Sequence, residues 1–322
     1  MARTTDKRES KRIEDLPGIG TQIVEKLKKL GYTTVETLAT ASLKELTDAL
    51  DEKTASAIIT EARKQLISVP FMRADEYMKI RNTIEQLTTG SKQFDLMLGG
   101  GIETQSMTEV YGEFGSGKSQ LCHQLCVNVQ LPKERGGLDG SALYIDTENS
   151  FRPERIVQMA RKLGLDHNEV LKRIVYAEAL TTDHQLYLVD TADTQFKEHN
   201  IRLIIIDSLI AHFRSEYVGR EMLAERQQVL EKHLHRLMRF ARAFNAVAFV
   251  TNQVVARPDS LFQDIGPTGG HILAHTSHTR LFLRKSSGSR VKIARLIVSP
   301  NLPEGGECPF RISEDGVEDA SS

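Results

Sequence analysis

Apolar residues follow two different spacings along the chain, and the change between them divides it into two parts. In the first part, apolar residues recur every three or four positions at Leu16, Ile19, Ile23, Leu27 and Leu30, and Gly31 follows. Because residues at this spacing share one face of a helix and glycine commonly ends one, the pattern predicts a helix up to Gly31. Similar spacing up to Leu66 predicts further short helices, so residues 13–68 are expected to form a small all-α domain.

From the glycines at 99–101 onward, short β-prone apolar runs alternate with helical segments. The expected strands are residues 107–111, 142–146, 173–176, 201–206, 246–251, 280–284 and 293–298. Strands that alternate with helices indicate an α/β fold with a mostly parallel sheet flanked by helices. We place this core at residues 93–313, after a linker at 69–92 with few core signals. Residues 1–12 are expected to be disordered and 314–322 to be an acidic tail.

A complete phosphate-binding pattern, G-x-x-x-x-G-K-[ST], lies between an expected strand and an expected helix. It consists of Gly112, Glu113, Phe114, Gly115, Ser116, Gly117, Lys118 and Ser119, and Gln120 continues into the helix. Glycines let backbone N–H groups surround a polyphosphate, the lysine reaches the β- and γ-phosphates, and the hydroxyl of Ser119 ligates Mg²⁺. The helix N-terminus also attracts phosphate. The chain is therefore expected to bind ATP or GTP together with Mg²⁺.

Polar residues at the ends of three other expected strands complete a nucleotide site. Asp207 ends an apolar run and fits the Walker B acid that supports Mg²⁺, since ligands bind at the carboxyl edge of such a sheet. Glu148 follows another strand, where it is either ordinary strand-end polarity or the group that polarises the attacking water. Asn252 and Gln253 end a third strand, where an amide can sense a γ-phosphate and signal its presence to the following segment.

Two segments that leave the same expected edge of the sheet suit nucleic acid. They are residues 213–220 and 254–270, and they carry Arg214, Tyr217, Arg220, Arg257 and Phe262. Arginine combined with aromatic residues suits a nucleic-acid backbone and splayed bases. Lysine and arginine outnumber aspartate and glutamate by seven to four over residues 212–242 and by seven to two over 257–295. For either stretch alone, a solvated surface is the simpler explanation.

The segment Leu16-Pro17-Gly18-Ile19-Gly20 has the form of the hairpin in a helix-hairpin-helix motif. Its glycines would let backbone N–H groups meet a DNA phosphate at a helix N-terminus without reading the base sequence. Taken alone, the segment could equally be a turn that starts a helix. The nearby Lys26, Lys28 and Lys29, and the separate small domain around the hairpin, favour DNA.

Composition and charge exclude several classes of protein for this chain. The net charge is −1, so the uneven distribution of charge, and not its sum, points to nucleic acid. The chain has no apolar run of about 18 residues and no signal-peptide pattern, so we expect a cytoplasmic protein that does not enter a membrane. Three cysteines do not make a disulfide framework, and Cys122 and Cys126 are expected to be small buried hydrophobes.

In this order, these pieces resemble the RecA/RadA recombinase family, and closely its archaeal RadA type, over residues 13–313. Beyond the nucleotide motifs, the resemblance rests on residues 88–102, 144–148, 151–155, 223–227 and 252–254. It implies a RecA-type P-loop ATPase core behind a helix-hairpin-helix domain, and a DNA-dependent ATPase with ATP between neighbouring subunits. It also implies a filament on single-stranded DNA that pairs with a homologous duplex and exchanges strands. The implied partners are single- and double-stranded DNA, further copies in a filament or ring, and a recombination mediator or paralogue, with a nucleoid location.

The resemblance also implies roles for single residues. Lys118 and Ser119 would hold phosphates and Mg²⁺, Asp207 would support Mg²⁺, Glu148 would activate water, and Gln253 would sense the γ-phosphate. Arg155 would pack by the adenine, while His275 and Pro300 would face the nucleotide of the neighbouring subunit. The expected DNA contacts are Gly18, Ile19, Gly20, Arg214, Tyr217, Arg220, Arg226, Arg257, Gly269 and Gly270.

The linker segment from Phe71 to Ala74 resembles the F-x-x-A polymerisation motif of this family. A phenylalanine on a linker has no local core to join, so it either inserts into the next subunit or folds back onto its own domain. Two positions depart from the family pattern. Val298 stands where the family often has an aspartate that helps to bind a monovalent cation, which puts cation-stimulated activity in doubt. Ser119 replaces the commoner threonine but keeps the hydroxyl.

The residues therefore favour an ATP-dependent recombinase over two alternatives. A regulatory paralogue would bind nucleotide and a recombinase without exchanging strands. Such paralogues tend to lose the N-terminal block, the linker phenylalanine or catalytic residues, and this chain keeps all three. A RecA-core helicase or kinase-like ATPase would require neither the hairpin at Leu16–Gly20 nor the linker motif.

Overall fold

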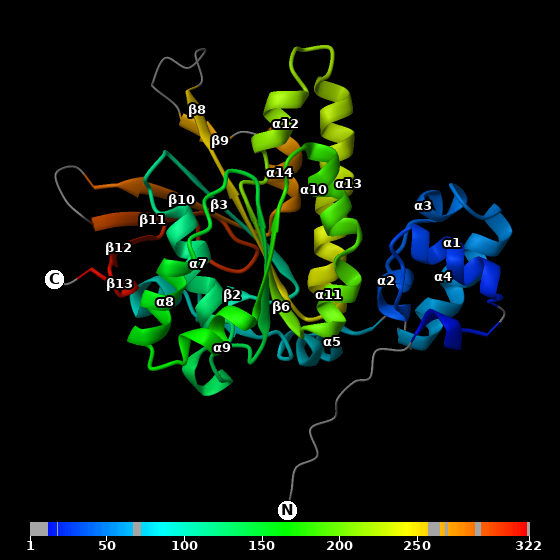
Figure 1. Cartoon of the computed structure of the whole chain (residues 1–322), viewed down its shortest axis with the longest axis horizontal. Coiled ribbons are helices and arrows are strands. Elements are labelled where there is room, and N and C mark those ends of the chain that lie inside the picture. Colours follow the sequence, from blue (N-terminus) through cyan, green and yellow to red (C-terminus); the bar gives the residue numbers. More distant parts are fainter. Residues whose placement is uncertain are drawn as a thin grey trace, which may run out of the picture. The chain divides into compact units, whose positions relative to one another are not determined.

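The computed structural model describes residues 12–17, 19–66, 72–256, 265–267, 270–286 and 291–320. It divides the chain into two compact units (Figure 1). The first unit comprises residues 1–81 with 190–194, and the second comprises 82–189 with 195–322. The predicted site residues Gly18, Phe71, Arg257 and Gly269 lie outside the described residues.

The N-terminal unit consists of short helices around an apolar core of its own. Its elements are η1 (Ile13–Asp15), α1 (Thr21–Lys29), α2 (Val35–Ala39), α3 (Leu43–Thr47), α4 (Glu52–Leu66) and α5 (Ala74–Arg81). Leu27, Leu38 and Leu46 are fully buried in that core. Helix α3 begins with a capping box, in which the Glu45 N–H donates to Ser42 Oγ at 3.3 Å and the Ser42 N–H donates to Glu45 Oε2 at 3.2 Å. The predicted all-α character of this region is confirmed by these elements.

The second unit is an α/β domain built on a nine-stranded sheet with the order β13-β12-β11-β10-β3-β7-β6-β4-β5. The six strands from β10 to β5 run parallel. They are β10 (Thr279–Lys285), β3 (Ser106–Gly112), β7 (Val247–Asn252), β6 (Ile201–Asp207), β4 (Ser141–Asp146) and β5 (Ile174–Glu178). These bounds confirm the predicted strands to within a few residues. The inner strands are buried over almost their full length, and β4, β6 and β7 are also mostly apolar.

Helices cover both faces of the parallel strands. Helices α7 (Lys118–Asn128) and α13 (Leu223–Ala243) pack on β3, β6 and β7 from opposite sides (Figure 1). The remaining helices after residue 82 are α6 (Lys92–Met97), η2 (Lys133–Arg135), α8 (Pro153–Lys162), α9 (His167–Lys172), α10 (Thr182–Asp190), α11 (Ala192–Glu198), α12 (Ala211–Glu216) and α14 (Gly270–Thr276). The last residue of α10 and the first three of α11 are counted in the first unit. Cys122 and Cys126 on α7 are fully buried in the core, as predicted. Among the described residues, no helix is both long and apolar enough to cross a membrane.

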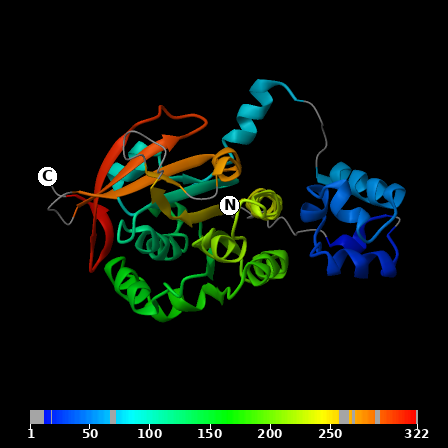
Figure 2. The same cartoon turned by 90° about the horizontal axis from the view of Figure 1, so that it is seen from above.

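The sheet continues past β10 as antiparallel strands, which Figure 2 shows in orange and red. They are β11 (Val291–Val298), β12 (Glu307–Ser313) and β13 (Gly316–Asp319). The predicted acidic tail at 314–322 is therefore wrong for β13, which pairs with β12 and buries Val317. The Val317 N–H also donates to Gln124 Oε1 at 2.9 Å. The acidic residues of β13 gave no strand pattern in the sequence. An edge strand can carry such residues because only one of its faces has to be buried.

The predicted linker at 69–92 also needs correction. It contains α5 and the short strand β1 (Gln86–Leu87), which pairs with β2 (Ile102–Glu103). Leu87 is fully buried, so the core begins before residue 93. A strand of two residues leaves no periodic signal in the sequence. Likewise, the ends of the predicted irregular segment 254–270 pair as β8 (Val254–Ala256) with β9 (Ile265–Pro267), and Gly270 begins α14.

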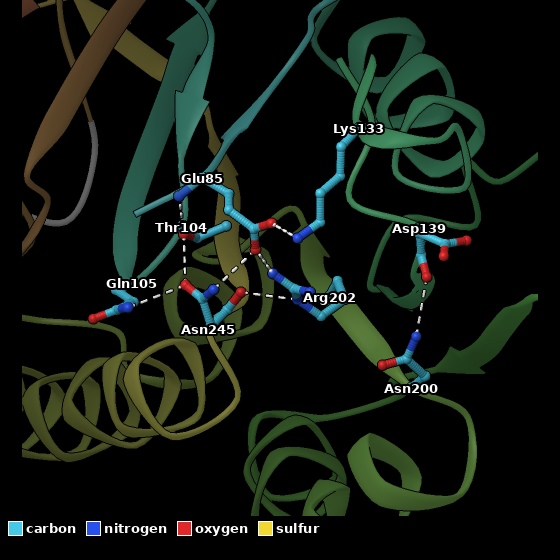
Figure 3. Close-up of polar contacts among 8 residues, drawn as sticks. All are labelled: Glu85, Thr104, Gln105, Lys133, Asp139, Asn200, Arg202 and Asn245. Carbon is cyan, nitrogen blue, oxygen red and sulfur yellow. Dashed lines mark hydrogen bonds and ion pairs between the residues drawn. The ribbon is translucent and has the colours of Figure 1, made fainter. Parts of the chain in front are cut away.

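A polar cluster lies at the amino edge of the parallel strands, close to the starts of β3, β6 and β7 (Figure 3). Its centre is Glu85, whose carboxylate pairs with Lys133 and Arg202 and accepts a hydrogen bond from Asn245 Nδ2 at 2.9 Å. Thr104 Oγ1 in turn donates to Asn245 Oδ1 at 2.7 Å. These contacts connect Glu85, which precedes β1, to Lys133 on η2, Arg202 on β6 and Asn245 just before β7.

Candidate functional site

The phosphate loop joins the end of β3 to the start of α7, so its residues lie at the carboxyl edge of the sheet. Gly117 caps α7 with a φ of 107°, and a Cβ there would lie 2.5 Å from Ile312 Cδ1. The left-handed φ is what requires glycine here, since the Ile312 methyl lies at the end of a side chain that can move. A Cβ on Gly112 would lie 2.2 Å from the Leu283 carbonyl oxygen of the neighbouring strand β10. The loop thus presents backbone where side chains would not fit, as phosphate binding requires.

Lys118 is the first residue of α7, and its side chain turns back across the loop. Its Nζ donates to the carbonyl oxygens of Gly112 at 2.8 Å and Glu113 at 3.0 Å. Partial burial lowers the pKa of Lys118, while the carboxylates of Asp207 and Glu148 oppose that shift. The ammonium is therefore placed within electrostatic reach of both predicted acids.

Other loop residues divide into buried and exposed positions. Ser116 is buried, and its hydroxyl has no hydrogen-bond partner within the described part of the chain. Phe114 is 95% exposed at the tip of the loop. Ser119, the predicted Mg²⁺ ligand, is partly buried in the first turn of α7, directly after Lys118.

Asp207 ends β6 and is buried among hydroxyl groups from three other segments. Tyr144 Oη donates to Asp207 Oδ2 at 2.8 Å, and Ser150 Oγ donates to the same oxygen at 3.0 Å. Thr251 Oγ1 donates to Oδ1. Tyr144 and Asp146 lie two residues apart on β4, so both side chains lie on one face of the strand. Tyr144 was not among the predicted site residues, although this alternation was a sequence signal for it.

Glu148 lies in the loop after β4, and the backbone of that loop is held in place. Asp146 is buried, and its carboxylate accepts the N–H groups of Glu148 at 3.1 Å, Ser150 at 3.1 Å and Phe151 at 2.9 Å. Thr147 Oγ1 donates to the Ser208 carbonyl at 2.8 Å, directly after Asp207. In the sequence, Asp146 is only the last residue of the expected strand 142–146, whereas in the structure its carboxylate shapes the Glu148 loop.

His123 on α7 contacts the residues at the end of the same loop. Burial lowers the pKa of His123 to about 4, so the ring is neutral near pH 7. Its Nε2 accepts the Arg152 N–H at 3.1 Å. The ring stacks on Tyr144, with 5.9 Å between centroids, and lies 5.4 Å from the ring of Phe151.

Gln253 and Asn252 are neighbours in the sequence, but their side chains contact different residues. Gln253 Nε2 donates to Glu148 Oε1, and Arg214 Nη1 on α12 donates to Gln253 Oε1 at 3.2 Å. Asn252 is fully buried, and its Nδ2 donates to Glu109 Oε1 at 2.8 Å. Of the two neighbouring amides at the end of β7 and directly after it, Gln253 is therefore the one that faces Glu148, the predicted catalytic residue.

Partial burial raises the pKa of Glu148, and the nearby Asp207 carboxylate raises it further. Lys118 and the hydrogen bond from Gln253 act in the opposite direction. A carboxylate with a raised pKa is better matched to accepting a proton from water than an ordinary exposed glutamate.

Arg155 on α8 is engaged by the protein itself. Its Nε donates to Gln120 Oε1 at 2.8 Å, and its Nη2 donates to the Ser313 carbonyl at 2.9 Å. It thereby joins α7, α8 and the end of β12. Its predicted position beside an adenine stays a prediction.

The predicted DNA residues of the first loop lie beyond the same edge of the sheet. Arg214 and Arg220 are exposed, and Arg226 is partly buried on α13. Tyr217 ends α12 and stacks on Phe213, with 6.1 Å between ring centroids. In the N-terminal unit, Gly20 is the N-cap of α1 and is exposed.

His275, Pro300 and Ala74 are all exposed. His275 lies in the last turn of α14, and Pro300 follows β11. Ala74 begins α5, a helix in which no residue is buried. These positions are compatible with contacts to a neighbouring subunit.

The residues at the carboxyl edge fit ATP with Mg²⁺. Mg²⁺ commonly keeps several waters and binds through one or two carboxylates together with substrate phosphates. Among the described residues, no cluster of three or more His, Cys, Asp or Glu could hold a metal ion by itself. Ser119 could supply a hydroxyl and the buried Asp207 a carboxylate as protein ligands, with water and phosphate at the remaining positions. Both belong to the edge of the sheet that carries the phosphate loop, where Gly112 and Gly117 must be glycine.

Comparison with known proteins gives consistent matches over both units. A family model described as Rad51 matches residues 80–320, and a model described as a SAM-like helix-hairpin-helix tandem matches residues 10–64. The chain is 49% identical over 319 residues to the DNA repair and recombination protein RadA of Aeropyrum pernix, covering 98% of both chains.

Proposed function

We propose, since this chain belongs to the Rad51 family of recombinases, that it couples ATP binding and hydrolysis at the carboxyl edge of its sheet to homologous pairing of DNA. Members of this family act in homologous recombination and DNA repair as DNA-dependent ATPases, and they form filaments and exchange strands.

One observation carries the ATPase assignment. Groups from four separate segments, Lys118, Glu148, Asp207 and Gln253, meet at one edge of the sheet. The phosphate loop and Lys118 would hold the triphosphate of ATP. Ser119 and Asp207 would hold Mg²⁺, which neutralises charge on the β- and γ-phosphates when bound. Glu148 would accept a proton from the attacking water, which is the role that its raised pKa favours.

Self-association would complete the site. His275 and Pro300 are exposed on the second unit, and we propose that they face the ATP of an adjacent subunit. The segment from Phe71 to Ala74 would join subunits, with Ala74 at the start of the exposed helix α5. ATP bound between subunits would then hold the filament together as well as supply free energy.

DNA would follow the first loop, through Arg214, Tyr217, Arg220 and Arg226, and the second loop, to which Arg257, Gly269 and Gly270 belong. The N-terminal hairpin around Gly20 would add a contact to a phosphate through backbone N–H groups. Such contacts to phosphates weaken as the salt concentration rises. We also propose that the protein is cytoplasmic and nucleoid-associated. A recombination mediator or paralogue would be a further partner.

Lys118→Ala provides the direct test. Removing the ammonium should abolish both ATP hydrolysis and strand exchange, measured by phosphate release and by joint-molecule formation from single-stranded and duplex DNA. Lys172→Ala is a matched control, because Lys172 is an exposed lysine paired with Glu169 on α9. Normal strand exchange by Lys118→Ala would refute the assignment, and a wild-type ATPase indifferent to single-stranded DNA would favour a regulatory paralogue.

A further inference from the structure

A chain of hydrogen bonds connects the first predicted DNA loop to the predicted catalytic acid. Arg214 Nη1 donates to Gln253 Oε1 at 3.2 Å, and Gln253 Nε2 donates to Glu148 Oε1. The chemistry of the two end groups fixes the orientation of the amide between them. A guanidinium can only donate and a carboxylate can only accept, so the oxygen of Gln253 must face Arg214 and its nitrogen must face Glu148.

The backbone at the centre of this chain is anchored. The Gln253 N–H donates to Asn252 Oδ1 at 2.8 Å, and Asn252 Nδ2 donates to Glu109 Oε1 at 2.8 Å. Glu109 is fully buried on β3 and pairs with Arg280 Nε of β10 at 2.7 Å. Because contacts through β3 and β10 hold the end of β7, the side-chain amide of Gln253 is the part that can turn.

The Glu148 end is anchored in the same way, through the backbone contacts of its loop to Asp146 and Ser208. Arg214, by contrast, is exposed on α12, a helix of six residues that leads into the first DNA loop. An exposed guanidinium forms stronger hydrogen bonds with a phosphate than with a neutral amide. A DNA phosphate close to α12 would therefore compete with Gln253 for Arg214.

We infer that Arg214 is a positioning residue for Glu148, acting through the side-chain amide of Gln253, in addition to any contact that it makes with DNA. This inference rests on the proposed ATPase function. With Arg214 bonded to Gln253, the amide is held toward Glu148 and occupies one carboxylate oxygen. When DNA takes Arg214, the amide loses its orienting donor, and that oxygen becomes available to the attacking water. DNA binding and ATP hydrolysis are thereby linked through one side chain.

Arg214→Gln tests this link. The ATPase rate without DNA should rise by about three- to tenfold, the range expected for the loss of one hydrogen bond. KM for ATP should stay unchanged, and the stimulation at saturating single-stranded DNA should shrink by the same factor as the basal rate rises. A structural lesion would not raise the basal rate. A residue that only contacts DNA would change the DNA concentration needed for half-maximal rate and leave the basal rate alone.

Arg161→Gln is the matched control, since it makes the same change of charge at an exposed position on α8. It should match the wild type with and without DNA. A basal rate of Arg214→Gln at or below that of the wild type, with DNA stimulation of the wild type intact, would overturn the inference while leaving the proposed function in place. A wild type that does not respond to DNA at all would refute both.

Discussion

The two edges of the parallel sheet both carry charged side chains, but they balance these charges differently. At the amino edge, the Glu85 carboxylate lies between two cations, Lys133 and Arg202, and also accepts from Asn245. At the carboxyl edge, Glu148 and Asp207 lie close to each other, and Lys118 directs its hydrogen bonds to backbone carbonyls. At the amino edge, the protein's own cations neutralise the carboxylate. At the carboxyl edge, two carboxylates lie where an additional positive charge would be favourable.

The pKa directions follow this difference. Burial alone would raise the pKa of Glu85, but the hydrogen bonds from Lys133 and Arg202 outweigh it and hold the pKa below its ordinary value. Partial burial and the Asp207 charge instead hold the pKa of Glu148 above its ordinary value. Balanced charges stabilise a fold, whereas carboxylates with raised pKa values cluster at sites that act on ligands. Substitutions at the two edges should therefore affect different properties.

The largest effect is expected for Glu148→Gln at the carboxyl edge. The amide keeps the size of the side chain but cannot accept a proton, so the ATPase kcat should fall by at least about 100-fold. Nucleotide affinity, measured with a fluorescent ATP analogue, should be nearly unchanged, and so should the midpoint of urea unfolding. Glu154→Gln, at an exposed position on α8, is the control. A kcat within twofold of the wild type would remove Glu148 from the mechanism.

Glu85→Gln at the amino edge should show the opposite behaviour. The change leaves Arg202, whose side chain is 15% exposed, without its carboxylate, so the free energy of unfolding should fall by about 1–2 kcal/mol. The ATPase kcat per folded molecule should match that of the wild type. Urea unfolding followed by circular dichroism measures the first quantity, and phosphate release at a permissive temperature measures the second. Glu169→Gln, which breaks the exposed pair with Lys172, should leave both unchanged.

Tyr144→Phe should give a smaller effect confined to the carboxyl edge. It removes one of the hydroxyl groups that hold Asp207, while Thr251 and Ser150 remain. If Asp207 supports Mg²⁺ as proposed, the Mg²⁺ concentration for half-maximal ATPase activity should rise by about tenfold, because groups that orient a metal-binding carboxylate tune the affinity for the metal. A loss of activity that excess Mg²⁺ does not restore would contradict this role.

The smallest effects are those of pH, and they differ in kind at the two edges. Glu85 binds fewer protons in the folded than in the unfolded chain, so its contribution is present above its ordinary pKa of 4.5. That contribution should be lost as the pH falls through the lower folded pKa, and the wild type should then approach Glu85→Gln in stability. For Glu148, ATPase activity should fall as the pH drops through a pKa above 4.5, because the protonated acid cannot act as a base. An acidic limb at the same pH in Tyr144→Phe and the wild type would exclude the tyrosine contact as its origin.

The elements predicted best were those with local patterns. The inner strands of the sheet and the helix after the phosphate loop appear where their apolar runs place them. The elements predicted worst were β1, β13 and the β8–β9 pair, which are short or lie at edges. Each of these strands is held by a partner strand or by a side chain such as Gln124, and not by a pattern of its own.

The phosphate loop, the acids at the strand ends and the helical N-terminal domain could be predicted from the amino-acid sequence, because each depends on residues that are neighbours along the chain. Which polar groups meet depends on how the chain folds. Glu148 and Gln253 are 105 residues apart, Tyr144 and Asp207 are 63 apart, and Arg214 and Gln253 are 39 apart. Parallel strands bring these residues to one edge because their carboxyl ends all point the same way. Which amide faces the acid, and which arginine faces that amide, depends on side-chain packing across several strands, and that packing has no signature in a linear pattern.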